Sequence, residues 1–426
     1  MPRVVVVGGG WAGCAAALAA KRAGGDVVVL EKTDCLLGTG LVGGIFRNNG
    51  RFTAAEEMIA MGGGDLFQLM DQVARHKNIE FPGHKHASLY DVALIEPLVR
   101  RYLLEHGVEL WLMSRVCEVT AAEGRIASVC TDTGETFEGD VFVETTGSAG
   151  PQGNCRKYGN GCAMCVLRCP SWGGRVSIAA KAGVKEVMGR KADGSIGAMS
   201  GSCKLHKDSV DRGIVSELNR TGVAVVPIPK DLVHAEKLAI KCCQQYALPE
   251  FAENLVLLDT GHVKLMTSYF PLGDLRRIPG MENSRYEDPY SGGKGNSMRY
   301  LAMSPRDDTL KVEGVDNLFC GGEKAGLLVG HTEAISTGVL AGHNAVRWAL
   351  GRPLLTLPRT TAVGDAIAYV REQMQTEEGL TKKFTFSGSV LLERLRELKL
   401  YTTDVAAIAE RIEAAGLSGA LARRVE

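Results

Sequence analysis

The sequence predicts an α/β fold around a parallel sheet, and three patterns in its 426 residues support that prediction. Residues 3–7, Arg-Val-Val-Val-Val, are apolar on both faces, as buried parallel strands are. An alanine-rich helix from Trp11 to Ala23 and a second buried strand at Asp26–Leu30 complete a βαβ unit. A later apolar strand ends at Cys320, where Gly-Gly-Glu follows and another helix begins a few residues on.

The segments between these elements add helices and a small antiparallel sheet. Helical periodicity covers residues 53–77 and 91–106, and a further helix is expected at 231–247. Short alternating segments over 108–145, separated by turn signals, indicate a β-meander. The meander leads into one more buried strand, Val141–Glu144.

The residue composition and the apolar pattern of the sequence change near residue 150 and again near residue 306. Glycine-rich and polar stretches replace the apolar strands in between, and apolar positions recur at helical spacing after residue 361. We therefore predict a dinucleotide-binding domain from residues 1–150 and 306–360, an inserted substrate domain at 151–305, and a helical tail at 361–426.

The composition argues against several classes of protein. Lys+Arg 49 balances Asp+Glu 49, so the net charge does not indicate RNA binding, although a local basic patch would permit it. Twelve cysteines in a chain of this size do not resemble a secreted disulfide framework, and residues 1–8 enter a strand without a charged leader. No apolar run is long enough to span a bilayer. We expect a cytoplasmic protein without membrane partners that forms a homo-oligomer.

A glycine-rich turn marks the first candidate site. Gly8-Gly9-Gly10-Trp11-Ala12-Gly13 follows a strand and opens a helix, which is the context that a dinucleotide fingerprint requires. Its three key glycines permit a tight turn, a close approach to a pyrophosphate and close packing of helix on strand. A carboxylate at Glu31 can accept hydrogen bonds from ribose hydroxyls, and it argues against NADP because it would repel a 2′-phosphate. The predicted cofactor-binding residues here are Gly8, Gly10, Trp11, Ala12, Gly13, Glu31 and Lys32.

The choice between FAD and NAD depends on the later strand. An acid placed like Glu323, after Gly322, reaches the ribityl and pyrophosphate region in FAD proteins. The meander and the strand end at Thr145-Thr146-Gly147 also suit a flavoprotein with two dinucleotide-binding domains. We favour FAD over NAD, while a purely structural strand end stays as the alternative. This interpretation adds Val116, Gly147, Gly322 and Glu323 to the predicted cofactor-binding residues.

Four cysteines form the second candidate site, with the spacing C-x6-C-x2-C-x3-C-P at Cys155, Cys162, Cys165 and Cys169. Thiolates are soft ligands for zinc, copper(I) and iron–sulfur clusters, and structural zinc usually shows two separated C-x2-C pairs. We predict a [4Fe–4S] cluster, with zinc or unligated redox thiols as alternatives and Cys203 as a possible replacement ligand. The adjacent cysteines 242 and 243 fall in an expected helix and are assigned to packing.

Longer motifs near the end of the chain resemble one known family. Asn317-Leu-Phe-Cys-Gly-Gly-Glu, Gly326-Leu-Leu-Val-Gly-His-Thr-Glu-Ala and Gly338-Val-Leu-Ala-Gly-His-Asn-Ala are similar to the closing FAD segment of the GidA family. That family includes a folate- and FAD-dependent tRNA uracil-5-methyltransferase and a tRNA uridine carboxymethylaminomethyl-modification flavoprotein. The segment from Leu357 to Val370 looks most like the methyltransferase branch. The resemblance covers residues 1–50 and about 309–370.

The resemblance implies FAD bound across both ends of the chain, with residues 326–334 along the flavin. It adds Gly330, Thr332 and Glu333 to the predicted cofactor-binding residues. His331 stands where the family usually has an aromatic residue, and we treat it as a candidate catalytic proton relay or a packing substitute. The relatives carry a cysteine after the ribose-binding acid, whereas residues 41–50 here contain none.

Three functions follow from these sites. The first is an FAD-dependent oxidoreductase that couples flavin chemistry to a [4Fe–4S] cluster, because a flavin links two-electron to one-electron chemistry. NAD(P)H, a ferredoxin or folate could then serve as electron donor. The second is a folate- or RNA-linked modification enzyme, and the third is a non-catalytic redox sensor.

Overall fold

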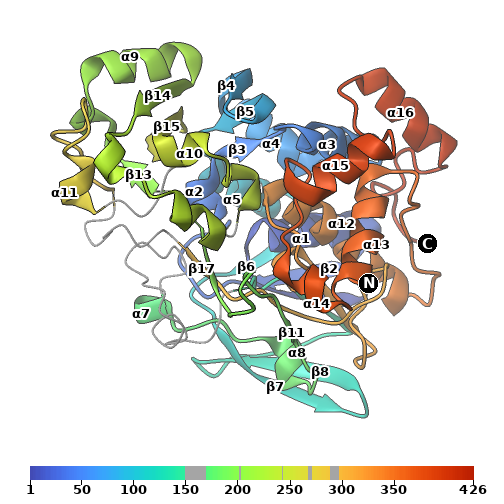
Figure 1. Ribbon diagram of the computed structural model, residues 1–426. Helices are drawn as coiled ribbons and strands as arrows, with labels where there is room; N and C mark the ends of the chain where they lie inside the picture. Colours follow the sequence, from blue (N-terminus) through green and yellow to red (C-terminus); the bar gives the residue numbers. More distant parts are fainter. Residues whose placement is uncertain (149–168, 201–202, 242, 267–270, 288–296) are drawn as a thin grey trace.

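The computed structural model describes residues 1–148, 169–200, 203–241, 243–266, 271–287 and 297–426 (Figure 1). A five-stranded parallel sheet organises the fold, in the order β19-β10-β1-β2-β6. Its strands are β1 (Arg3–Val7), β2 (Asp26–Leu30), β6 (Glu109–Trp111), β10 (Val141–Glu144) and β19 (Leu318–Cys320). The predicted α/β fold is confirmed, and helix α1 (Trp11–Ala23) has the predicted bounds.

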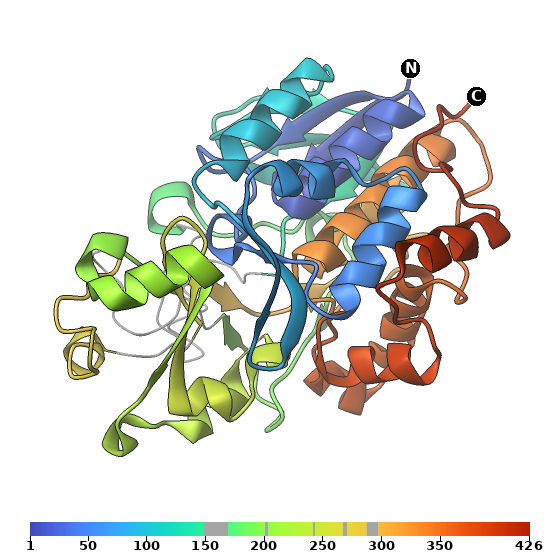
Figure 2. The same cartoon turned by 90° about the horizontal axis from the view of Figure 1, so that it is seen from above.

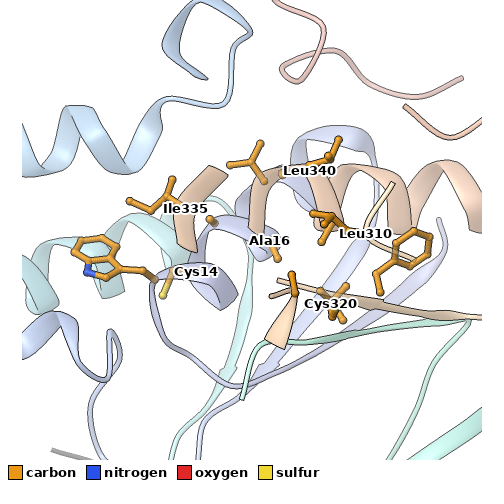
Figure 3. Packing of buried hydrophobic residues seen from close by; sticks show 14 of the residues in the cluster. Cys14, Ala16, Leu310, Cys320, Ile335 and Leu340 are labelled. Atoms are coloured by element: carbon orange, nitrogen blue, oxygen red, sulfur yellow. The ribbon is translucent and has the colours of Figure 1, made fainter. Parts of the chain in front are cut away.

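Helix α12 (His331–Ala349) packs across α1, which lies more than 300 residues earlier in the chain (Figure 3). Two glycines of α12 permit the close approach. A methyl group on Gly338 would lie 2.2 Å from the Ala12 carbonyl oxygen, and one on Gly342 would lie 2.1 Å from that of Ala16. Strand β19 and helix α12 therefore return the chain to the sheet that its first residues began.

The segment between β2 and β6 corrects one helix prediction. Residues 53–77 are not one helix but α3 (Gly50–Ala60), α4 (Asp65–Gln72) and the start of strand β4 (Ala74–Phe81). Gly62 ends the first helix with φ at +85°, a conformation that favours glycine. Strand β4 then pairs antiparallel with β5 (His84–Tyr90), so tertiary pairing overrides the local helical pattern. The other elements of this segment are α2 (Gly40–Gly43), β3 (Ile45–Phe46) and α5 (Ile95–Glu105).

The predicted meander is present as an antiparallel sheet of β7 (Val116–Ala122), β8 (Arg125–Thr131) and β9 (Thr136–Glu138). A separate antiparallel sheet, in the order β13-β16-β15-β14, lies in the middle of the chain. Its strands are β13 (Cys203–Leu205), β14 (Val223–Pro227), β15 (Asn254–Asp259) and β16 (Val263–Leu265). Helix α9 (Arg212–Thr221) packs on this sheet, which has its own buried cluster. The β4–β5 hairpin lies between this unit and the rest of the molecule (Figure 2).

The prediction of a helix at residues 231–247 is wrong. The described residues there form three short 3₁₀ turns at Lys230–Leu232, Ala235–Ile240 and Gln244–Tyr246. A continuous helix is replaced because Lys241 turns inward, where its ammonium donates to the carbonyl oxygens of Tyr246 and Met266, each at 3.2 Å. Cys243 therefore does not lie in an α-helix. The remaining elements are α7 (Cys169–Trp172), α8 (Ile178–Lys181), β11 (Val187–Met188), β12 (Ala198–Ser200), α10 (Glu250–Glu253), α11 (Leu272–Leu275), β17 (Ser297–Arg299) and β18 (Ala302–Met303).

The tail is helical, as predicted, and it packs against the N-terminal half. It contains α13 (Ala362–Gln373), α14 (Glu377–Thr381), α15 (Ser389–Glu397) and α16 (Val405–Ala414). The Val425 amide donates to the Ala23 carbonyl oxygen at 3.0 Å, so the last residues lie beside the end of α1. The two termini are accordingly close together (Figures 1 and 2).

One buried carboxylate joins the tail to α3. Glu57 is fully buried, and it accepts hydrogen bonds from the Ala362 amide at 2.8 Å, the Val363 amide at 3.0 Å and the Arg411 guanidinium at 3.1 Å. We expect Glu57→Ala to lower the free energy of unfolding by about 3–5 kcal/mol, because a buried guanidinium contact and two helix N–H groups lose their acceptor. Urea titration measures this change. Exposed Glu378→Ala is the control, and equal stability of the two variants would contradict the prediction.

Candidate functional site

A cleft opens at the carboxyl ends of β1, β2 and β10, where open α/β sheets bind their ligands. Its walls include the β1–α1 turn, the end of β2, residues 145–148 and residues 321–323. The start of α12 and residues from the middle of the chain complete it, namely Lys241, Cys243, Gln245, Tyr246, Lys264 and Met266. We call the part formed by Lys241, Cys243, Tyr246 and Lys264 the lysine end of the cleft.

The glycine-rich turn fits a pyrophosphate. Gly8 has φ at +102°, and Gly10 lines the cleft with no atom of the described residues within 4 Å of the place where a Cβ would stand. Helix α1 begins at this turn, and none of the side chains that the structure describes caps it, so its first N–H groups can meet an anion. Trp11 and Ala12 also line the cleft. The turn thus offers both the space and the donors that a dinucleotide phosphate needs.

Glu31 lines the cleft at the end of β2 and holds the turn in place. One carboxylate oxygen accepts the Gly9 amide at 2.7 Å, and the other accepts the Thr33 amide at 2.9 Å. Each oxygen keeps a further lone pair that a ribose hydroxyl could use. Lys32 and Val116 also line the cleft, and the Lys32 ammonium donates to the Gly173 carbonyl oxygen at 2.9 Å.

The second dinucleotide element reaches the same cleft. Gly147, Gly322 and Glu323 line it, and the Glu323 carboxylate accepts a hydrogen bond from the Ser148 hydroxyl. Gly330 precedes α12 with φ at +146° and also lines the cleft. Because none of the described side chains caps α12, its N-terminus presents positive partial charge to the cleft. The contact of all these residues with a cofactor stays a prediction.

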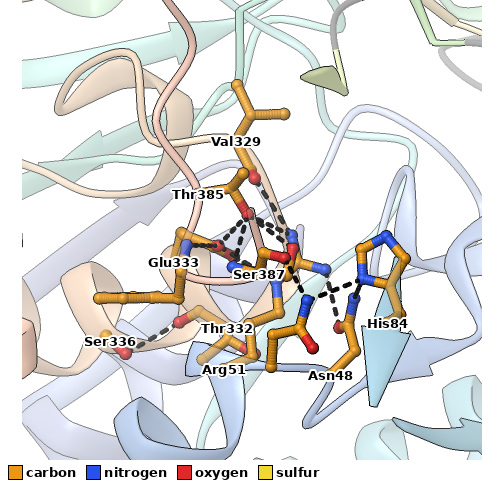
Figure 4. Close-up of polar contacts among 11 residues, drawn as sticks. Asn48, Arg51, His84, Val329, Thr332, Glu333, Ser336, Thr385 and Ser387 are labelled. Atoms are coloured by element: carbon orange, nitrogen blue, oxygen red, sulfur yellow. Dashed lines mark hydrogen bonds and ion pairs between the residues drawn. The ribbon is translucent and has the colours of Figure 1, made fainter. Parts of the chain in front are cut away.

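Three residues predicted to bind the cofactor do not line the cleft. Gly13 lies against the Gly8 carbonyl and serves helix–strand packing. Thr332 is fully buried, and its hydroxyl has no hydrogen-bond partner among the described residues. Glu333 is fully buried in a polar network rather than facing the cleft, as Figure 4 shows.

That network connects the tail to the cleft through Arg51. The Arg51 guanidinium, which lines the cleft, pairs with Glu333 at 3.1 Å and donates to the Thr385 hydroxyl at 3.1 Å (Figure 4). Glu333 in turn accepts hydrogen bonds from the Thr385 hydroxyl and the Phe386 amide. Arg51 also donates to Asn48 at 3.3 Å. Sequence patterns gave no signal for this arginine, because its partners lie near residues 330 and 385.

His84 extends this network of hydrogen bonds to the 3₁₀ turn that contains Gln245. Its Nε2 donates to the Gln245 carbonyl oxygen at 3.0 Å, and its Nδ1 accepts from the Asn48 amide at 3.0 Å. Burial lowers the pKa of His84 to about 3. The ring is thus neutral at physiological pH and fixes the backbone beside Tyr246.

We expect His84 to make the fold sensitive to acid. Between pH 6.5 and about 3 the unfolded chain binds a proton that the folded chain does not, so stability falls as the pH falls, by up to about 1.4 kcal/mol per pH unit. In His84→Gln that contribution disappears and the slope flattens. Urea titrations at pH 7 and pH 4.5 measure it, with exposed His106→Gln as control. If the free energy of unfolding changes equally with pH in the wild type and in His84→Gln, His84 is not the origin of the acid sensitivity.

The lysine end contains functional groups that the sequence patterns did not identify. Lys241 and Lys264 are 3% and 2% exposed, and burial lowers the pKa of Lys241 to about 8 and that of Lys264 to about 7. Cys243 lies close enough to influence both lysines and Arg51 electrostatically. Cys243 packs against two hydrophobic clusters, as predicted, and it also lines the cleft. The sequence pattern that could have identified these residues, a lysine before two cysteines, is a weak signal for a functional site.

His331 lies in the cleft wall at the start of α12. Its ring packs on Gly43, where an added methyl group would lie 1.6 Å from its Cε1 atom. Its Nδ1 is 3.3 Å from the Tyr90 hydroxyl, which itself donates to the Gly40 carbonyl at 2.8 Å. A hydroxyl that donates to a carbonyl accepts from the ring, so Nδ1 carries a proton and Nε2 can act as acceptor. A catalytic role stays a prediction.

Most of the four-cysteine motif lies outside the described residues, namely Cys155, Cys162 and Cys165. Cys169 begins α7 and is half-buried. Within the described ranges, no group of three or more His, Cys, Asp or Glu side chains could hold a metal ion. Cys203 is buried in the core of the middle sheet, and burial raises the pKa of its thiol to about 12.

Comparison with known proteins identifies the family. The sequence model of the Glucose inhibited division protein A (GidA) family matches residues 3–256 and 252–353, more than half of the chain. The chain belongs to the GidA family. In agreement, the fold matches the crystal structure of Aquifex aeolicus GidA with a TM-score of 0.59 over 97% of this chain and 76% of that one, at 16% identity. The predicted resemblance to this family is confirmed.

Curated relatives match over shorter segments. A methylenetetrahydrofolate–tRNA-(uracil-5-)-methyltransferase TrmFO from Lactobacillus acidophilus is 30% identical over 131 residues, 29% of each chain. A tRNA uridine 5-carboxymethylaminomethyl modification enzyme MnmG from Chlorobaculum tepidum is 31% identical over 116 residues, 27% of this chain and 18% of that one. The match thus spans less than a third of either relative. Among the described residues, every helix is too short or too polar to cross a membrane.

Proposed function

We propose that this GidA-family chain binds FAD in the cleft and catalyses a flavin-dependent modification of RNA, with Cys243 as the reacting thiol. FAD supplies hydride and electron-pair chemistry when it is bound. Gly8, Gly10 and the N-terminus of α1 would hold its phosphates, and Glu31 its ribose. Gly322, Glu323 and the N-terminus of α12 would hold the part nearer the ring.

One observation carries the assignment of Cys243. Cys243 lines the cleft together with three cationic side chains, those of Arg51, Lys241 and Lys264. Reactive cysteines occur at partly exposed positions beside such cations, and Cys243 is half-buried. The cysteine that the family resemblance implies at residues 41–50 is missing, so the inserted segment supplies a thiol to the cleft instead.

The other residues of this site position and protect the thiol. Lys241 and His84 fix the 3₁₀ turn that follows Cys243 through the carbonyls of Tyr246 and Gln245. Arg51 is held by Glu333 and Thr385 and cannot turn away. Because the Nδ1 of His331 carries the proton that faces the Tyr90 hydroxyl, its Nε2 could accept a proton beside the flavin.

The test uses unmodified tRNA transcript, methylenetetrahydrofolate and NADH with protein purified without oxygen. We expect one FAD per chain and a mass increase on uridine, detected in nucleoside digests by mass spectrometry. Cys243→Ser should lower the rate by at least about a hundredfold. Cys117→Ser is the matched control, since that cysteine lies outside the cleft. A fully active Cys243→Ser enzyme, or protein that never binds FAD, would refute the proposal.

A second proposal is electron exchange between FAD and a [4Fe–4S] cluster, and it rests on the spacing of Cys155, Cys162, Cys165 and Cys169. Cys169 supports it, because Gly174 lines the cleft only five residues later. At about 3.6 Å per residue that chain reaches at most about 18 Å. About four irons and four sulfides per chain, lost in Cys165→Ala, would support the cluster. Zinc, or no metal under strict anaerobiosis, would exclude it.

The division into a cofactor domain (1–150 and 306–360), an inserted domain (151–305) and a tail (361–426) is also kept as a proposal. The separate hydrophobic cluster of the middle sheet supports the inserted unit. A different cluster of buried hydrophobic residues, however, joins strand β15 to the β4–β5 hairpin. The N-terminal half therefore shares a hydrophobic core with that unit.

A further inference from the structure

Two lysines from different elements converge on the lysine end of the cleft. Lys241 lies between two 3₁₀ turns, and its ammonium donates to Tyr246 and Met266 carbonyl oxygens, each at 3.2 Å. Lys264 lies on β16, and its ammonium donates to the Val42 carbonyl oxygen. Both residues line the cleft, although nearly all of their surface is buried.

The position of these lysines places them beside the predicted flavin. Val42, which accepts from Lys264, precedes Gly43, on which the His331 ring packs at the start of α12. His331 belongs to the segment that the family resemblance places along the flavin. The lysine end is therefore the part of the cleft where a substrate would meet the reacting ring.

Burial withdraws both ammonium groups of the lysine end from water, and this is the main cause of their lowered pKa values. Among the charged neighbours of Lys264, the thiols of Cys203 and Cys243 raise its pKa, whereas the ammonium groups of Lys204 and Lys241 lower it. Cys243 also raises the pKa of Lys241. An anion bound between the two lysines would favour their charged forms. Buried charges in proteins are usually paired, and an anion in the cleft would pair with these two.

We propose that Lys241 and Lys264 form an anion-binding pair, which holds a negatively charged group against the flavin ring. The group is either a carboxylate of a small-molecule substrate or the reduced flavin itself. This inference rests on the proposed FAD site. It names the charge that the site accepts, and it does not depend on RNA as substrate.

The pair should bind anions in a pH-dependent way. Both lysines are charged at low pH and lose their protons as the pH rises through about 7 for Lys264 and about 8 for Lys241. Anion affinity is accordingly highest below pH 7 and falls between pH 7 and 9. The thiols of Cys203 and Cys243 and the ammonium of Lys204 also face Lys264, so Cys243→Ser is included to separate their contribution.

The experiment uses FAD-loaded protein, and FAD content is measured first, which tests the proposed function separately. Benzoate is titrated as the carboxylate probe while flavin absorbance is followed from pH 6 to 9.5. The flavin midpoint potential is measured over the same range. Variants are Lys241→Met, Lys264→Met and the double variant, with exposed Lys230→Met as the control from the same segment.

Two results would support the pair and distinguish its ligand. A benzoate Kd that rises at least tenfold in the double variant, and with pH in the wild type, assigns the pair to a substrate carboxylate. A midpoint potential that falls in the double variant by about 30 mV, which is a tenfold change for a two-electron couple, assigns it to the reduced flavin. An FAD-loaded double variant with both properties unchanged would overturn the inference. The wild-type pH profile needs no variant. A benzoate Kd that is constant from pH 6 to 9.5, together with a midpoint potential whose slope against pH does not change between pH 7 and 8, would overturn the inference as well.

Discussion

Replacing Gly13 with alanine is expected to destabilise the protein and abolish FAD binding. The added methyl group would lie 1.8 Å from the Gly8 carbonyl oxygen and 2.8 Å from the Thr145 hydroxyl oxygen, both far inside van der Waals contact. Either α1 moves off the sheet or the turn that receives the pyrophosphate opens. We expect the free energy of unfolding to fall by about 1–3 kcal/mol, as it does for other overpacked sites.

Gly10→Ala is the matched variant, because it adds the same methyl group three residues earlier. At Gly10 no atom in the part of the chain that the structure describes lies within 4 Å of that methyl group, which would instead occupy the place proposed for a phosphate. Gly10→Ala should therefore unfold like the wild type in urea but bind FAD more weakly. Flavin content and urea titration of both variants measure the contrast. If Gly10→Ala keeps wild-type FAD affinity, the pyrophosphate does not lie on this turn.

The second large effect is expected for Arg51→Met. The guanidinium pairs with Glu333, and the two side chains are 4% and 0% exposed. Removing one partner of a buried pair leaves the other charge uncompensated, which typically costs about 3–5 kcal/mol. Because Arg51 also lines the cleft and is held by Thr385, the same variant should lose FAD affinity and loosen the tail.

Three measurements separate these consequences. Urea titration reports the stability loss, flavin content reports the cleft, and limited proteolysis after residue 380 reports the tail. Arg396→Met is the control, since its ion pair with Glu393 is exposed and such pairs contribute at most about 1 kcal/mol. A loss in Arg51→Met no larger than in the control would show that the network is not required for stability.

The first dinucleotide element could be predicted from sequence because its signal is local. The unit consists of four valines before a glycine-rich turn, an alanine-rich helix, and a second strand that Glu31 follows, and these elements are adjacent in the chain. Apolar periodicity and glycine placement determine such units directly, and β1, α1 and β2 have the predicted bounds. The predictions of longer helices were wrong where tertiary contacts compete with apolar periodicity, as in strand β4 and in the 3₁₀ turns near Lys241.

The sequence by itself thus determined the parallel sheet, the glycine turn, the acid after β2 and the family. Tertiary structure alone decided which side chains meet at the lysine end of the cleft. Lys264 reaches the Val42 carbonyl across 222 positions, and Arg51 reaches Glu333 across 282. No local pattern encodes such pairs, because side-chain periodicity reports only the face that is buried. Which residues share that buried space is decided by how the elements pack.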